Sequence, residues 1–156
     1  MANGSVSNAP PAIAVGNLIA GFVAGFLAVL VFHQSVLFYL HQVGFTNAAA
    51  YSMRQTAPFG VPQVLSLAFW GGVWGVLFAL MEPRLSRGAP YWLGAIVFGA
   101  IFPSLVAWFV VFPLKGIPMA ASWHAKGLET GLMVNGAWGF GTALFMLPMR
   151  NRLRRA

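Results

Sequence analysis

The chain has 156 residues, of which 59% are hydrophobic, 15% aromatic and only 7% charged. Soluble domains carry about 25% charged residues, so the composition excludes a soluble fold and predicts one all-α integral membrane domain. The net charge is +7, but the basic residues lie in loops and at the ends of apolar runs, which excludes a nucleic-acid-binding face. The absence of cysteine excludes disulfides, thiolate metal sites and covalently attached haem.

The chain begins with a small polar tail over residues 1–11, followed by an apolar run over about 12–40. This run is longer than the apolar core of about 7–15 residues in a signal peptide, so we expect it to remain in the membrane as the first span. Gly21 and Gly25 form a GxxxG pair, which lets another helix approach closely.

The longest connection covers residues 43–62. Pro58, Gly60 and Pro62 disfavour a continuous helix before the second span. Two interpretations stay open for this segment: a short re-entrant or interfacial segment, or an ordinary exposed loop.

The second and third spans are predicted over 64–81 and 91–111, joined by a tight turn over 82–90. The third span contains Pro103, which removes a backbone hydrogen bond and predicts a kink that neighbouring helices must compensate.

The fourth span is predicted over 128–147, and a basic tail over 148–156 ends the sequence. The connection over 114–125 contains Trp123, a residue type that anchors helices at the membrane interface. The chain is therefore expected to form four transmembrane helices within a membrane domain over 12–147.

A glycine-tryptophan pattern appears in both the second and the fourth span. The sequence Gly72-Val73-Trp74-Gly75 returns 64 positions later as Gly136-Ala137-Trp138-Gly139. This indicates two helical hairpins in the same orientation, as in parallel repeats. A duplication is the hypothesis, and coincident packing chemistry is the alternative. The residues predicted to pack helices together are Gly21, Gly25, Gly71, Gly72, Gly75, Gly136, Gly139, Trp74 and Trp138.

The distribution of the nine basic residues predicts the orientation. Arg84, Arg87 and four arginines of the C-terminal tail lie on the side that holds both termini, whereas Arg54, Lys115 and Lys126 lie on the other side. The excess marks the side of the termini as cytoplasmic. Basic residues at the ends of spans also attract anionic lipid headgroups.

Three segments resemble a group of small four-helix inner-membrane proteins of proteobacteria to which we can attach no activity. The segments are Phe59-Gly60-Val61-Pro62, Leu65-Ser66-Leu67-Ala68-Phe69-Trp70-Gly71-Gly72 and Val134-Asn135-Gly136-Ala137-Trp138-Gly139. The resemblance covers most of the chain from the first span onward. It implies a bacterial inner (plasma) membrane and assigns no role to any residue.

His33, followed by Gln34, lies near the outer end of the first span. A histidine at membrane depth can ligate a tetrapyrrole or a metal or relay protons, and an interfacial imidazole bonded to a neighbour is the simpler interpretation. Met133 is a conceivable second haem ligand, although ordinary core packing is the simpler interpretation of this methionine. A metal site joining His33, His41 and His124 lacks the short spacing of zinc motifs, so no metal is predicted.

Asn135 lies within the fourth span, where an amide either bridges helices or lines a polar path. The indoles of Trp70, Trp74 and Trp138 lie well inside the spans, and their N–H groups require acceptors from other helices or from a bound molecule such as a pigment or quinone. No paired carboxylates, Ser-His-Asp set or phosphate loop is present, so no catalytic residue is predicted.

The leading functional hypothesis is a non-enzymatic subunit that packs within a larger membrane complex or a homo-oligomer, surrounded by membrane lipids. An oligomeric small-solute channel or transporter, using His33, Gln34 or Asn135 as polar residues, is the first alternative. A membrane subunit that binds a tetrapyrrole or a quinone, with His33 as the ligand, is the second.

Overall fold

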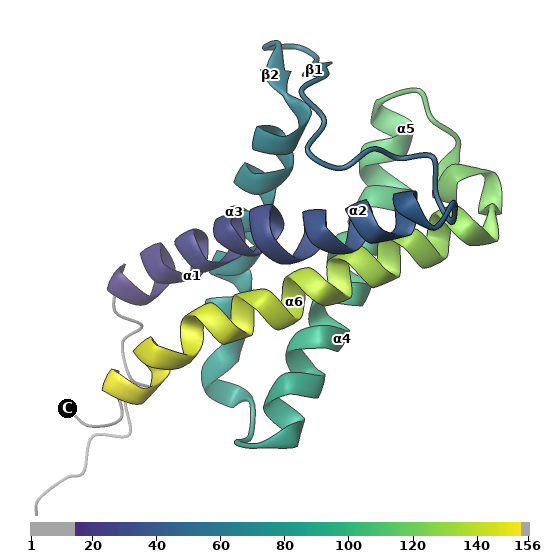
Figure 1. The fold of residues 1–156 in the computed structure, drawn as a ribbon. Coiled ribbons are helices and arrows are strands. Elements are labelled where there is room, and N and C mark those ends of the chain that lie inside the picture. The colour runs from purple at the N-terminus through teal and green to yellow at the C-terminus, as the bar shows by residue number, and fades with distance from the viewer. Residues whose placement is uncertain (1–14, 154–156) are drawn as a thin grey trace, which may run out of the picture.

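The computed structural model describes residues 15–153 and contains four long helical segments (Figure 1). The polar tail over residues 1–11 and the last three residues of the basic tail lie outside the described range. The first helical segment consists of α1 (Val15–Ala28), the π-helical turn η1 (Val29–His33) and α2 (Gln34–Gln42). The later elements are α3 (Gln63–Met81), η2 (Glu82–Arg84), α4 (Ala89–Val106), η3 (Ala107–Val111), α5 (Phe112–Leu114), η4 (Met119–Trp123) and α6 (Ala125–Leu153).

Three helical segments are long and apolar enough to cross a membrane: Val15–Gln42, Gln63–Arg84 and Ala89–Leu114. The prediction of an all-α, multi-pass membrane protein is confirmed at this level. The fourth helix, α6, is longer but less apolar, because glycines, threonines and Asn135 interrupt its hydrophobic residues. Many of its middle residues are buried against the other helices, so α6 needs fewer lipid-facing side chains.

The third segment continues through Pro103 as helix and changes to the π-helical turn η3 four residues later. The first segment contains a corresponding π turn, η1, in its C-terminal half. A π turn widens the helix locally and is frequently found at functional positions.

The connection between α2 and α3 contains a small hairpin of two strands, β1 (Gln55–Thr56) and β2 (Val61–Pro62), which pair antiparallel. Gly60 adopts φ 66°, a conformation that glycine accepts without steric cost. Figure 1 shows the hairpin projecting beyond the N-terminal end of α3. Over residues 43–62 the structure describes turns and this hairpin but no helix, and both interpretations of this segment stay open.

The four long helices form two crossed layers (Figure 1). One layer holds α1–α2 beside α6, and the other holds α3 and α4. Helix α1 packs mainly against α3, α6 packs mainly against α4, and α1 also packs against α6. The consecutive helices α3 and α4 touch only slightly, so the two layers are held together by the α1–α3 and α4–α6 crossings.

The backbones of α1 and α3 are in direct contact where they cross. A Cβ atom added to Gly21 would lie 2.5 Å from the Gly75 carbonyl oxygen, and one added to Gly25 would overlap the Gly71 carbonyl oxygen. Additions at Gly71 and Gly75 would in turn collide with α1. Any side chain at these four positions would force the two helices apart.

The α4–α6 crossing is built in a similar way. A Cβ atom on Gly139 would overlap the carbonyl oxygen of Ala95, and one on Gly99 would overlap that of Asn135. Gly136 differs, because its added Cβ would meet only the Ala100 and Ile96 side chains at 3.6 Å, an ordinary van der Waals distance. The α4–α6 crossing therefore contains tight and roomy glycines side by side.

The remaining predicted packing residues contact aromatic rings or backbone. Gly72 lies under the Phe22 ring, which is 2.7 Å from the position of its missing Cβ. The Trp138 indole donates a hydrogen bond of 2.9 Å from Nε1 to the Gly25 carbonyl oxygen, which joins α6 to α1. Trp74 lies edge-on to the Phe98 ring at 6.2 Å, which joins α3 to α4.

The contrast between two glycines gives a matched test of the crossing. We expect Gly75→Ala to lower the free energy of unfolding by about 2 kcal/mol, because the added methyl group meets backbone that cannot rotate away. Gly136→Ala adds the same methyl group where there is room, and its effect should stay within about 0.5 kcal/mol. Thermal unfolding in mild detergent measures both, and equal midpoints would contradict the close approach of α1 and α3.

Candidate functional site

The most polar part of the membrane domain lies where the π turn η1 meets α2. His33 ends the turn and Gln34 begins the next helix, and both are buried, with Gln34 only 1% exposed. Burying a polar side chain in an apolar domain is costly unless it is hydrogen-bonded. The hydrogen-bond partners of the Gln34 side chain therefore indicate its role.

Gln34 joins the connection over residues 43–62 to the first helical segment. Its Oε1 accepts a hydrogen bond of 2.6 Å from the backbone N–H of Tyr51. The Tyr51 hydroxyl group donates in turn to the Leu30 carbonyl oxygen at 2.9 Å. Tyr51 has φ 52°, a left-handed conformation that is unusual for a bulky residue and persists only where its surroundings hold it. The two hydrogen bonds supply that restraint.

A cavity of about 300 Å³ lies beside Gln34, between α2, the outer connection and the start of α3. Its polar lining comes from Gln34, Asn47, Ser52, Arg54 and Gln63. Its apolar lining comes from Leu37, Ala48, Ala49 and Leu67. This volume is at the small end of ligand-binding pockets.

Arg54 is the only charged residue of the cavity lining. The chain has two acidic residues, Glu82 and Glu129, and neither lines the cavity. The cavity is therefore a positively charged space, with amide and hydroxyl groups around it and aliphatic side chains beside them.

The other predicted polar residues lie away from this cavity. Asn135 donates a hydrogen bond of 2.9 Å from Nδ2 to the Ser104 hydroxyl group, which joins α6 to α4. His33 is not part of the cavity lining, and its Nδ1 lies 3.4 Å from Gln34 Nε2. The hydrogen bond to Ser104 holds the Asn135 side chain within the helix bundle.

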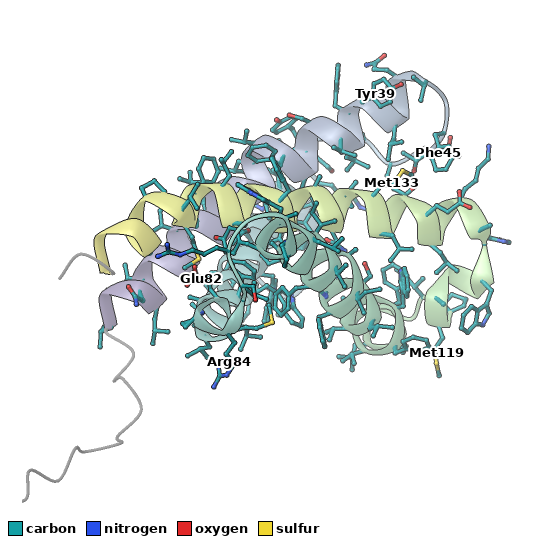
Figure 2. All side chains as sticks on the ribbon, turned by 90° about the horizontal axis from the view of Figure 1, so that it is seen from below. Tyr39, Phe45, Glu82, Arg84, Met119 and Met133 are labelled. Atoms are coloured by element: carbon teal, nitrogen blue, oxygen red, sulfur yellow. The ribbon has the colours of Figure 1, made fainter. Side chains whose placement is uncertain are left out.

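The structure does not bring the three histidines into one cluster. Over residues 15–153, no group of three His, Cys, Asp or Glu side chains lies close enough to hold a metal ion. His41 instead lies 3.2 Å from the Thr46 carbonyl oxygen through Nδ1. Met133 is 39% exposed, and Figure 2 shows it near Phe45, at the outer end of the bundle.

The sequence pattern indicates Arg54 only as one of the charges that set orientation, and it does not single out Asn47, Ser52 or Gln63. A weak signal was available, since Arg54 is the one basic residue of the 43–62 connection and has polar neighbours. The sequence does not show that Gln34, twenty positions before Arg54, lines the same cavity.

Comparison with known protein families, with curated proteins and with solved structures gives no match to this chain. The geometry of its own residues therefore carries the functional argument.

The role of Gln34 as a fastening point can be tested by limited proteolysis. Arg54 is the only trypsin site within the 43–62 connection. Gln34→Leu removes the acceptor of the Tyr51 N–H and should cost about 1–3 kcal/mol of local stability, so cleavage after Arg54 should accelerate severalfold. Gln42→Leu, at an exposed position at the end of α2, serves as the control. Equal cleavage rates in the two variants would contradict this role.

Proposed function

We propose that this protein is a non-enzymatic multi-pass membrane subunit that associates laterally with other membrane subunits or with a second copy of itself. The glycines of the two crossings are already in contact within the chain. A lateral partner must therefore use another face. The best candidate is an aromatic face formed by Phe22, Phe69 and Trp70.

The aromatic face lies on the outside of the bundle. Trp70 is 58% exposed and Phe69 is 51% exposed. Their rings lie edge-to-face at 5.8 Å, and Phe22 lies edge-on to Phe69 at 5.9 Å. Three adjacent aromatic rings give a rigid surface, and tryptophan is the residue type most enriched at the energetic centres of protein interfaces.

The observation that carries the proposal is the indole N–H of Trp70. Trp70 lies seven residues after the start of α3, which places it roughly 10 Å along the helix, inside the apolar span. Among residues 15–153, none accepts a hydrogen bond from this N–H. A donor without an acceptor in hydrocarbon costs several kcal/mol. A carbonyl or side-chain oxygen of a neighbouring subunit would satisfy it.

The membrane arrangement that we propose has four crossing helices with both termini in the cytoplasm of a bacterial cell, in the inner membrane. It is supported by the excess of basic residues on one side. Arg84 lies towards one end of the bundle, whereas Tyr39, Phe45 and Met119 lie towards the other (Figure 2). The length of α6, 29 residues, is ample for a fourth crossing, which needs about 20.

We also propose that the two hairpins, α1 with α3 and α4 with α6, arose by duplication. The contacts of Gly21 and Gly25 with Gly75 and Gly71 have counterparts in those of Ala95 and Gly99 with Gly139 and Asn135. Both hairpins also have a π turn in the outer half of their first helical segment. These correspondences extend the repeated glycine-tryptophan pattern from sequence to contacts.

Lateral association through the aromatic face can be measured by native mass spectrometry after extraction in mild detergent. Trp70→Leu removes the indole N–H and the ring but keeps an apolar side chain, and we expect it to weaken association about tenfold. Phe102→Leu replaces a similarly exposed aromatic residue of α4 and should have no effect. Co-migrating polypeptides would identify other subunits, whereas a self-oligomer would favour a second copy and the channel alternative. Wild-type assembly by Trp70→Leu would overturn the proposal.

The proposed orientation can be tested directly because the natural chain has no cysteine. Single cysteines at Gln55→Cys, Ser86→Cys and Ala156→Cys report the outer connection, the middle turn and the C-terminus. In intact cells, a membrane-impermeant maleimide should label the first and leave the other two unlabelled until the cells are broken. Labelling of Ala156→Cys in intact cells would show that α6 does not complete a fourth crossing.

A further inference from the structure

We infer that the cavity beside Gln34 binds the phosphate group of a membrane lipid. The inference concerns the outer end of the bundle and is independent of the aromatic face. It depends on three features of the cavity: an unopposed positive charge, a buried amide with an available donor, and an apolar wall at the edge of the hydrocarbon.

The charge of Arg54 selects an anionic ligand. No acidic residue lines the cavity, so the guanidinium group is not opposed by a carboxylate there. Arginine presents several N–H donors in a plane that matches the oxygens of a phosphate group. Asn47, Gln63 and Ser52 add amide and hydroxyl donors around the same space.

Gln34 provides the second, independent feature, because its side chain is almost completely buried. Its Oε1 is engaged by the Tyr51 N–H, which orients the amide and leaves Nε2 as the donor end. The partner of Nε2 is His33 Nδ1 at 3.4 Å, longer than the usual range of about 2.7–3.2 Å. An amide nitrogen carries two N–H donors, so Nε2 has a second donor in addition to the one shared with His33, and Gln34 itself lines the cavity.

The position of the cavity favours a lipid over a free anion. Gln63 is the first residue of α3, and Leu67 lies one turn further along the same helix. The cavity thus lies at the level where an apolar span begins, which is the depth of lipid headgroups. Leu37 and Leu67 give the lining an aliphatic side, and Leu67 is 37% exposed at the surface. A phosphate beside Arg54 would leave the lipid chains to lie along α3.

Native mass spectrometry of the delipidated full-length protein tests the inference through added phosphatidylglycerol. We expect Arg54→Gln to lower the affinity for this lipid about tenfold, the usual effect of losing a charge-assisted hydrogen bond. Arg54→Lys keeps the charge and should retain part of the affinity. Lys115→Gln removes an exposed charge that does not line the cavity and should bind like the wild type. Unfolding midpoints of all variants show that each is folded.

Two further ligands separate the possible sources of the bound group. Diacylglycerol has the chains but no phosphate, and we expect no binding that depends on Arg54. Inorganic phosphate has the charge without chains, and we expect it to compete only weakly. Equal lipid binding by Arg54→Gln and Lys115→Gln would overturn the inference. Inorganic phosphate that binds as tightly as the lipid would overturn the lipid assignment and leave a site for a soluble anion.

Discussion

The contact between two helix backbones at the α1–α3 crossing is the constraint on which the rest of the bundle depends. Lipid chains are as apolar as the helices themselves, so burial of apolar surface gives little drive for association inside a membrane. Close packing and hydrogen bonds must supply it instead. With glycine at positions 21, 25, 71 and 75, α1 and α3 approach until carbonyl oxygen meets Cα, and this closeness positions α1 for its contacts with α6.

Several polar side chains within the bundle join helices through hydrogen bonds. The Tyr91 hydroxyl donates to the Ala143 carbonyl oxygen at 3.0 Å, and Asn135 donates to Ser104 at 2.9 Å; both join α4 to α6. Trp138 joins α6 to α1. At the outer end the pattern changes, because the polar groups around Arg54 line a cavity instead of pairing across a helix contact. The cavity therefore lies at one end of the bundle, away from the hydrogen bonds that join its helices.

The order and length of the helices could be predicted from sequence, because an apolar run of about 20 residues has few alternatives to a membrane helix. The partner of each glycine could not, since a GxxxG pair shows that a helix can be approached but not by which neighbour. Gly136 illustrates the limit: it has the same local pattern as Gly72, yet its Cβ position is roomy. The cavity was missed for a related reason. It forms where Gln34 meets a connection whose path depends on non-local hydrogen bonds.

The Gly25 carbonyl oxygen marks a point where three helices meet, and this has a consequence for biogenesis. Gly25 packs against Gly71 on α3 and accepts the Trp138 indole from α6. During synthesis, α1 and α3 emerge first and can form their glycine contact while α6 is still unmade. The Trp138 indole can then donate to the Gly25 carbonyl oxygen, which the contact between α1 and α3 already holds in position. Because α1 and α3 precede α6 in the chain, the glycine contact can be in place before Trp138 reaches the Gly25 carbonyl oxygen.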